Sequence, residues 1–426
     1  MQATSGKYYR NVEKCRVCGT EPLKEVLRIE DQFIASTFVE SNDDNMLSSI
    51  KIPLTLVICE SCKLVQLRET VEPDLLYRSY FYRTGVNETM ARDLRGLVQA
   101  TFERVETQPG DLAVDIGAND CTMISMFPDN LKRIAVEPAK NISWEGVDPS
   151  IEIVNDYFSK DAVNGVAGGR KIKAITSTAM FYDLDNPNGA TSDIKDLLAE
   201  DGICTIQVSH LAATIADMNF YDIVHEHLEY YTLHTLSNLM ERHDLRVVDA
   251  ETNAVNGGSI RVYVTHADRG LPVSDRYRGI LQWELDLKLD DPQTYVEYGR
   301  QIENSVQLAR GFIEREIDEG QLVIGLGAST KGNVLLQICG IGKDMLPYIS
   351  ERNPEKVGLR TLGTDIELIS EERARDMNPS AMLVIPWNFK TEILEREKDY
   401  IHQGGKMLFI MPYPHYVDES GEHRLS

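Results

Sequence analysis

Two histidines flank a glutamate in the segment 224–232, which reads VHEHLEYYT. The chain has only nine histidines in 426 residues, so a pair within one tripeptide is a candidate for chemistry. Imidazole has an unperturbed pKa of about 6.5 and is suited to move a proton near neutral pH. Three interpretations stay open: a general base with a helper carboxylate, a metal site built on both imidazoles, or a solvated cap for a helix expected at 233–242.

Four of the seven cysteines form two C-x-x-C pairs, Cys15 with Cys18 and Cys59 with Cys62. Two such knuckles supply four thiolates, the usual ligand set of a structural zinc ion. A redox pair would explain one C-x-x-C but not two so close in the chain. We therefore predict one structural Zn²⁺ held by all four cysteines, and we expect Cys204 and Cys339 in the core.

A third chemical feature is an apolar strand that runs into a glycine turn, DLAVDIGANDC at 111–121. Such a turn lets the backbone approach a ligand closely. The three-glycine dinucleotide fingerprint is missing, which disfavours NAD. A second expected strand at 133–136 ends at Glu137, where a carboxylate can bind ribose hydroxyls. Together the two segments favour S-adenosylmethionine (SAM).

The elements that position these residues follow an α/β pattern. Short apolar runs predict strands at 151–155, 172–177 and 203–208, with a helix at 191–200, and the close pair 245–250 and 259–265 predicts an antiparallel hairpin. After a helical stretch at 275–318, a strand at 321–325 enters a second glycine-rich turn, GLGASTKGN, and further strands are expected at 381–385 and 407–411. Its glycines either permit close helix–strand packing or, with Lys331, cradle a phosphate.

Charge and hydropathy exclude several partners. The chain has 67 acidic and 44 basic residues and a net charge of −23, which disfavours nucleic acid and membrane surfaces as partners. No apolar run approaches the ~20 residues that span a bilayer, and the N-terminal segment does not read as a secretory signal. We expect a cytoplasmic protein without a disulfide framework.

Several motifs together resemble the deoxysugar C-methyltransferases, enzymes that methylate a ring carbon of a nucleotide-linked keto sugar. Besides the paired cysteines they are YFYRTGVNETM at 80–90, VDIGAND at 114–120, VEPAKN at 136–141, HEHLEYY at 225–231, NGGSIRV at 256–262, GASTKGN at 327–333 and PWNF at 386–389. They span nearly the whole chain in the family's order. The resemblance implies an α/β protein with three parts: a small zinc-binding domain (1–75), a class I SAM methyltransferase domain (76–268), and a helical linker plus a C-terminal Rossmann-like domain (269–426) that helps hold the nucleotide sugar. We expect a monomer or a homodimer.

Methyl transfer to carbon requires removal of a proton α to a carbonyl and stabilisation of the enolate that results. From the resemblance we assign His227 as the base and Glu226 to its orientation or to sugar binding. His225 is the second imidazole, and Tyr80 or Tyr82 is a donor on the enolate side. The expected SAM contacts are Asp115, Gly117, Asn119, Asp120, Glu137 and Asp156, and the expected substrate contacts are Asn256, Lys331 and Asn333.

Three positions depart from the family pattern. Many relatives carry tyrosine where this chain has Val224, a glycine is usual at Cys121, and relatives often have a histidine within the stretch that here reads AMFYDLD (179–185). Neighbouring tyrosines (Tyr182, Tyr230, Tyr231) could substitute for the missing hydroxyl. Two alternatives stay open: an epimerase or isomerase that keeps the deprotonation and omits the methyl group, favoured if Cys121 abolishes SAM binding, and a non-catalytic nucleotide-sugar binder.

Overall fold

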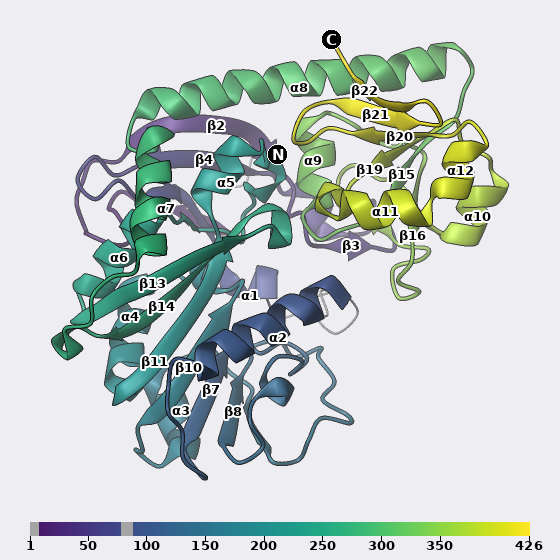
Figure 1. Ribbon diagram of the computed structural model, residues 1–426. Coiled ribbons are helices and arrows are strands. Elements are labelled where there is room, and N and C mark those ends of the chain that lie inside the picture. Colours follow the sequence, from purple (N-terminus) through teal and green to yellow (C-terminus); the bar gives the residue numbers. More distant parts are fainter. Residues whose placement is uncertain (1–7, 78–87) are drawn as a thin grey trace.

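The computed structural model describes residues 8–77 and 88–426, which form three sheets of four or more strands with helices around them (Figure 1). Tyr80 and Tyr82 lie outside the described residues. None of the helices in the described part of the chain is long and apolar enough to cross a membrane.

The N-terminal sheet is antiparallel and has the strand order β12-β5-β4-β2. Its central strand β4 reads IPLTLVI and is buried along nearly its whole length, as expected for a strand covered on both faces. The edge strand β12 comes from the HEH segment, far along the chain. The bounds are β1 (Tyr9–Asn11), β2 (Lys24–Gln32), β4 (Ile52–Ile58), β5 (Val65–Leu67), β6 (Glu69–Val71), β12 (Glu229–Tyr230), η1 (Met46–Ser49) and α1 (Pro73–Tyr77), and β1 pairs with β6 in a separate ribbon.

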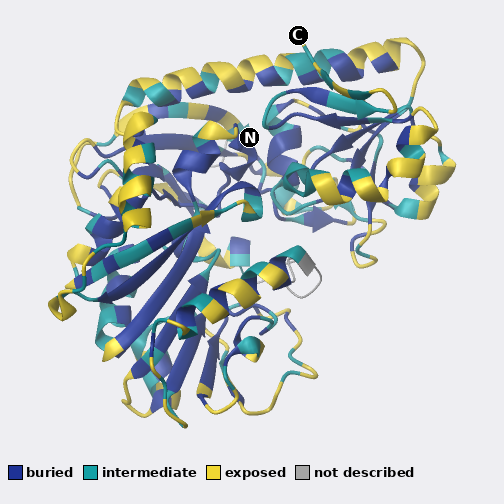
Figure 2. Ribbon diagram, viewed as in Figure 1, coloured by how far each residue is buried: buried dark blue, intermediate teal, exposed yellow. Residues whose placement is uncertain are grey.

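The central sheet has seven strands in the order β13-β14-β11-β10-β7-β8-β9. The five strands from β11 to β9 are parallel, and β13 and β14 form the antiparallel hairpin that the sequence predicts. Figure 2 shows these strands as largely buried. The bounds are β7 (Leu112–Ile116), β8 (Lys132–Val136), β9 (Ile151–Val154), β10 (Ile172–Thr178), β11 (Leu198–Ser209), β13 (Leu245–Asn253) and β14 (Ser259–His266).

The helix expected at 191–200 is wrong at both ends. The observed helix α4 (Pro187–Leu197) begins earlier, because the Asn186 side chain caps it and Pro187 occupies its first turn. It ends earlier because Leu198 already belongs to β11, where it pairs with Ile172. Strand pairing has therefore taken the last residues of the expected helix.

Further helices cover the central sheet and lead out of it. Among them, α6 is held by a capping box between Thr232 and Thr235, and α8 begins with the Asp291 cap followed by Pro292. The helical stretch expected at 275–318 is confirmed as two helices, of which α8 is long and exposed on its outer side (Figure 2). The bounds are α2 (Glu88–Phe102), α3 (Lys160–Ala167), α5 (Leu211–Ala216), α6 (Leu233–Glu241), α7 (Asp275–Asp286), α8 (Pro292–Asp318), η3 (Ile124–Met126), η4 (Phe181–Asp183), η5 (Phe220–Asp222), η6 (Val255–Gly257) and η7 (Ala267–Arg269).

The C-terminal sheet has nine strands in the order β22-β21-β20-β19-β15-β16-β18-β17-β3. Strands β20, β19, β15, β16 and β18 are parallel, and the strand expected at 321–325 is β15, shifted slightly toward the C-terminus. The bounds are β3 (Phe38–Val39), β15 (Val323–Leu326), β16 (Tyr348–Glu351), β17 (Arg360–Thr361), β18 (Glu367–Ser370), β19 (Ala381–Val384), β20 (Lys406–Phe409), β21 (His415–Asp418), β22 (Gly421–Arg424), α9 (Gly332–Ile338), α10 (Glu371–Asp376), α11 (Lys390–Arg396), α12 (Lys398–His402) and η8 (Trp387–Phe389).

Two short strands belong to sheets far from their own part of the chain. Strand β3, from the N-terminal segment, pairs with β17 at the edge of the C-terminal sheet, and β12 pairs with β5 of the N-terminal sheet. A single apolar core joins these regions, running from Leu54 of β4 through Tyr295 of α8 to Ile349 of β16. The parts of the chain are therefore packed into one another rather than strung in series.

Candidate active site and metal centre

A cavity of about 280 Å³ opens at the carboxyl ends of β7, β8 and β10, the edge of a parallel sheet where ligands of α/β proteins bind. Its wall also includes residues of the HEH segment, of η6 and of the C-terminal glycine-rich turn. Eight of the predicted site residues line it: Asp115, Gly117, Asn119, Glu137, Glu226, His227, Asn256 and Lys331. The structure thus gathers residues from distant motifs around one space.

The β7 turn brings the backbone to the cavity beside an acidic side chain. Gly117 has φ 77°, and a Cβ atom there would lie 3.0 Å from the Cβ of Met180, so glycine suits the close approach. The two carboxylate oxygens of Glu137 accept hydrogen bonds from the backbone N–H groups of Asn119 and Ala139, both at 2.8 Å. An acidic residue at the end of the second strand of such a sheet is placed to bind ribose hydroxyls.

A buried acid lies deeper in the same wall. Burial raises the pKa of Asp115 to about 8; the Thr176 hydroxyl, which donates to it at 2.8 Å, opposes the shift and Glu137 adds to it. A cationic ligand beside this carboxyl group would favour its ionised form. The glycine turn, the Glu137 carboxylate and apolar neighbours such as Met90 and Phe158 therefore fit SAM, which carries a ribose, an adenine and a positively charged methionine end.

Two predicted cofactor residues, Asp120 and Asp156, are not among the described residues of the cavity wall. Asp120 accepts hydrogen bonds from the backbone and the hydroxyl of Thr122, at 3.2 and 2.6 Å, and Asp156 is exposed and accepts from the N–H of Tyr157. Within the described ranges neither belongs to the cavity wall, although Tyr157 does. Their assignment to SAM stays a prediction without support from this geometry.

Cys121 stands where the family resemblance leads us to expect glycine, and its backbone explains that preference. Its φ is 64°, in the left-handed region that favours glycine. The side chain is fully buried and packs in the apolar core beside Met123 and Phe127 rather than in the cavity wall. Cys121 therefore leaves the SAM end of the cavity open, which removes the reason to favour an epimerase.

His227 lies in the cavity wall with a carboxylate behind it. Its Nδ1 is 3.5 Å from Oδ2 of Asp222, a fully buried residue at the end of η5, and its ring lies 4.1 Å from that of Tyr182, centroid to centroid. With Nδ1 turned toward Asp222, Nε2 is the ring nitrogen left for the cavity. Burial lowers the pKa of His227, and Asp222 opposes that shift. The imidazole is therefore neutral near pH 7, as a base must be.

Asp222 also forms an ion pair with Lys331, a residue of the C-terminal turn. Burial alone would raise the pKa of Asp222, but Lys331 and His227 hold it below its usual range. The carboxylate is thus charged and stabilises positive charge on the imidazole. Asp222 was not predicted from the sequence. It lies five residues before His227, and this spacing does not bring two side chains together on one face of a helix or a strand.

The other members of the HEH tripeptide have different surroundings. His225 is buried and its Nε2 donates to the backbone oxygen of Ile52 in β4 at 3.1 Å, and burial lowers its pKa to about 4. In the described part of the wall His225 is absent, so its catalytic assignment has no geometric support. Glu226 lines the cavity and accepts a hydrogen bond from the Ser36 hydroxyl, and burial raises its pKa. These contacts place Asp222 in the orienting position beside His227, and sugar binding by Glu226 stays a prediction.

Two alternative interpretations of HEH are wrong. The N-cap of α6 is Thr232, and the tripeptide is buried, so it is no solvated helix cap. Across residues 8–77 and 88–426, the only group of three or more side chains that could hold a metal ion is the set of four cysteines. The two imidazoles also point to different surroundings, Ile52 and Asp222.

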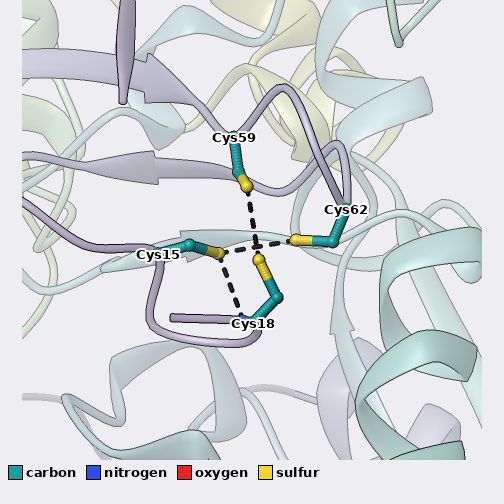
Figure 3. Close-up of side chains that lie close together, drawn as sticks. All are labelled: Cys15, Cys18, Cys59 and Cys62. Carbon is teal, nitrogen blue, oxygen red and sulfur yellow. Dashed lines mark hydrogen bonds between the residues drawn. The ribbon is translucent and has the colours of Figure 1, made fainter. Parts of the chain in front are cut away.

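The four cysteines converge as the spacing predicts (Figure 3). Their sulfur atoms all lie within 4.8 Å of one another, and the Cys15–Cys62 and Cys18–Cys59 sulfur distances are 3.4 Å. Four thiolates around zinc at ~2.3 Å would lie about 3.8 Å apart, so the site fits tetrahedral Zn²⁺. A zinc ion here would supply folding energy to the N-terminal region.

The first knuckle is linked directly to the HEH segment through Arg16. This buried guanidinium donates to the backbone oxygen of Leu67 at 2.6 Å and to the Thr70 hydroxyl at 2.7 Å. Its Nε lies 3.6 Å from the carboxylate of Glu229, a residue of β12 that pairs with Gln66 of β5. The first knuckle therefore helps to anchor β12, which begins two residues after His227.

The C-terminal glycine turn is explained by packing. A Cβ atom at Gly325, Gly327 or Gly332 would lie within 2.9 Å of an Ile349, Pro386 or Ile385 side chain, respectively. The N–H of Ala328 is also already bound by the carboxylate of Glu351 at 2.8 Å. Of the two interpretations of this turn, close packing accounts for all three glycines, while Lys331 turns to Asp222 and the cavity.

The remaining predicted substrate residues differ in placement. Asn256 has φ 56° and lines the cavity. Asn333 is buried and both ends of its amide are occupied, Nδ2 by the oxygen of Leu362 and Oδ1 by the hydroxyl of Thr364, each at 2.8 Å. Asn333 thus ties α9 to a neighbouring loop, and its assignment to substrate stays a prediction that this geometry does not support.

Family models and a curated relative match most of the chain. Family models match residues 15–77 (zinc binding domain), 86–250 (methyltransferase domain) and 254–414 (C-methyltransferase C-terminal domain). The C-methyltransferase NovU of Streptomyces niveus is 29% identical over 410 residues, covering 96% of this chain and 97% of NovU.

Solved structures resemble the chain over a smaller share. A SAM-dependent methyltransferase from Clostridium acetobutylicum matches with 11% identity and a TM-score of 0.32, over 41% of this chain and 92% of its own. The 1,6-didemethyltoxoflavin-N1-methyltransferase of Burkholderia thailandensis matches with 14% identity and a TM-score of 0.33, over 43% and 81%. The three family models, in this order along the chain, and the full-length relative show a SAM-dependent C-methyltransferase with matches to a zinc-binding domain at its N-terminal end and to a C-methyltransferase C-terminal domain.

Proposed function

We propose that this C-methyltransferase acts on a nucleotide-linked keto sugar, and that His227 forms the enolate whose carbon is methylated. The observation that carries the proposal is the His227–Asp222 pair, with 3.5 Å between Nδ1 and Oδ2, in the wall of the same cavity as Gly117 and Glu137. Methylating carbon requires a carbanion equivalent, so a base beside the cofactor end is the chemistry to expect. The sugar itself is supported by the motif resemblance.

In this proposal SAM supplies an electrophilic methyl group. Neutral His227 takes the proton α to the sugar carbonyl on Nε2, and the charged Asp222 stabilises the imidazolium through Nδ1. Lys331 holds Asp222 in the ionised form through its ion pair. Apolar wall residues such as Leu94 and Met180 keep water from the reacting carbon.

The two alternatives explain less of the structure. An epimerase would need the same base but has no use for the open cofactor end around Gly117 and Glu137. A non-catalytic binder leaves unexplained why a neutral imidazole and an ionised carboxylate are buried as a pair at the ligand cavity, an arrangement that costs folding free energy.

The test is exchange of the α-proton with deuterated solvent, measured by NMR on thymidine diphosphate-4-keto-6-deoxyglucose and on other 4-keto and 3-keto nucleotide sugars. His227→Asn should lose about 10²–10⁴-fold in both exchange and methyl transfer, the usual contribution of a positioned base. Binding of S-adenosylhomocysteine, measured by calorimetry, should stay unchanged.

His225→Asn is the matched control, since it alters the neighbouring imidazole outside the described cavity wall and should lose much less. If His227→Asn exchanges the proton at the wild-type rate, His227 is not the base. If the wild type neither exchanges nor methylates any keto nucleotide sugar, the proposed substrate class is wrong.

A further inference from the structure

Asp183 brings a further carboxyl group to the reaction end of the cavity, beside Asp222 and Glu226. It ends η4, directly after β10, and its backbone is fixed by the hydrogen bond from its N–H to the oxygen of Met180 at 2.9 Å. The residue lines the cavity together with His227 and Lys331. Its atom Oδ1 is buried and finds no hydrogen-bond partner among the described residues. A buried polar atom left without a partner needs an explanation, and a ligand is the simplest one.

We propose that Asp183, in its neutral form, donates a hydrogen bond to the carbonyl oxygen of the sugar and stabilises the enolate that His227 generates. This inference rests on the proposed function, because it needs a carbonyl substrate. It assigns the oxyanion-stabilising role to a residue of η4, in addition to the tyrosines that the motif resemblance suggests.

The surroundings of Asp183 favour the neutral form. Burial raises its pKa well above the ordinary value, and the nearby Glu226, Glu229 and Asp222 carboxyl groups add to this effect. Lys331 opposes the shift, but it is already paired with Asp222. Ionising Asp183 would place a negative charge in a buried wall that already holds the ionised Asp222, so the proton is retained.

A neutral carboxyl group is chemically suited to this position. When His227 takes the α-proton, the C–H electron pair forms the C=C bond and the carbonyl π electrons move onto oxygen. Asp183 keeps its proton, and its O–H···O hydrogen bond strengthens as charge grows on that oxygen. The carbonyl re-forms when the carbon gains the methyl group. Carboxylic acids held neutral by their sites serve as oxyanion donors in other enolising enzymes.

Two substitutions separate a neutral donor from a carboxylate. Asp183→Leu removes the donor and should lower both exchange and methyl transfer by about 10²–10³-fold, as loss of an oxyanion donor does. Asp183→Asn restores an N–H donor of similar shape and should stay within about tenfold of the wild type. In the wild type the rate should fall at high pH as Asp183 ionises, and this fall should disappear in Asp183→Asn.

Two further measurements complete the test. Calorimetric binding of S-adenosylhomocysteine to each variant should match the wild type, and the infrared difference spectrum between wild type and Asp183→Asn should contain the band of a protonated carboxyl group. Absence of that band, or equal inactivity of the Asn and Leu variants with normal cofactor binding, would overturn the neutral donor. Full activity of Asp183→Leu would do the same. If the wild type exchanges no keto-sugar proton, the proposed function itself is refuted. The outcomes above, seen in an active wild type, refute only the role of Asp183, so the two failures are distinguishable.

Discussion

Replacing Asp222 by asparagine tests the core of the proposed mechanism, because this carboxylate supports positive charge on His227. A unit charge 3.5 Å from the imidazole is worth about 5 kcal/mol at an effective dielectric constant of about 20. That energy corresponds to roughly three to four powers of ten in a protonation constant. Lys331, bound to the other oxygen of Asp222, cancels part of it. We therefore expect Asp222→Asn to lower the exchange rate by about 10²–10⁴-fold.

The structure also gives the direction in which the pH dependence of the rate should change. Burial lowers the pKa of His227 and Asp222 opposes that shift, so removal of the carboxylate lowers the pKa further. The acid limb of the rate profile, where His227 becomes protonated, should then move to lower pH while the plateau drops. Asp217→Asn is the matched control, because Asp217 is an exposed carboxylate at the end of α5. An acid limb that moves to higher pH, or a rate within twofold of wild type, would refute the role of Asp222.

Three further predictions concern the cofactor, the metal and pH. Glu137→Ala should weaken binding of S-adenosylhomocysteine by ~1.5–3 kcal/mol in calorimetry, whereas Asp156→Ala, an exposed change outside the described wall, should leave it unaltered. Metal analysis of protein never exposed to chelator should find about one zinc per chain, and Cys59→Ser should lower the thermal unfolding temperature and the exchange rate together, because the knuckle anchors β12. Between pH 6.5 and about 4, His225 takes up a proton in the unfolded chain but stays neutral in the folded protein, so the free energy of unfolding falls as pH falls through this window. Denaturant unfolding of His225→Gln should show a smaller fall over the same range, and an identical fall would contradict the buried neutral state.

Local patterns in the sequence were sufficient to predict most of the fold. Apolar runs and turns predicted the strands of the central sheet and its antiparallel hairpin, since a buried strand and a tight turn each have a local signature. The spacing of the cysteines likewise predicted their convergence. The placements of β3 and β12 were not predictable, because two-residue strands such as Phe38–Val39 have no periodicity and depend entirely on tertiary pairing.

Residues of the candidate site were predictable only where one short motif contains them and also determines how they are arranged in space. The turn at Gly117 and the acid at Glu137 belong to one strand–turn–strand unit, and both lie in the cavity wall. Asp222 and Asp183 were missed as chemical groups because their importance comes from neighbours brought by folding: an imidazole, a lysine from another domain and a low-dielectric wall. The same reason explains why His225, two residues before His227, contacts Ile52 of β4 and does not line the described cavity wall.

The position of His227 shows why the three domains are combined. Its segment continues into β12, a strand of two residues that is too short to be stable alone and is held by β5 and by Arg16 of the first zinc knuckle. Its partner Asp222 is held in the charged form by Lys331 from the C-terminal domain. In the proposed mechanism the central sheet supplies the cofactor end of the cavity, β5 and Arg16 hold the segment of the proposed base, and Lys331 keeps Asp222 ionised. A methyltransferase domain isolated from these two neighbours would keep the Gly117 turn and lose the geometry that the proposed deprotonation requires.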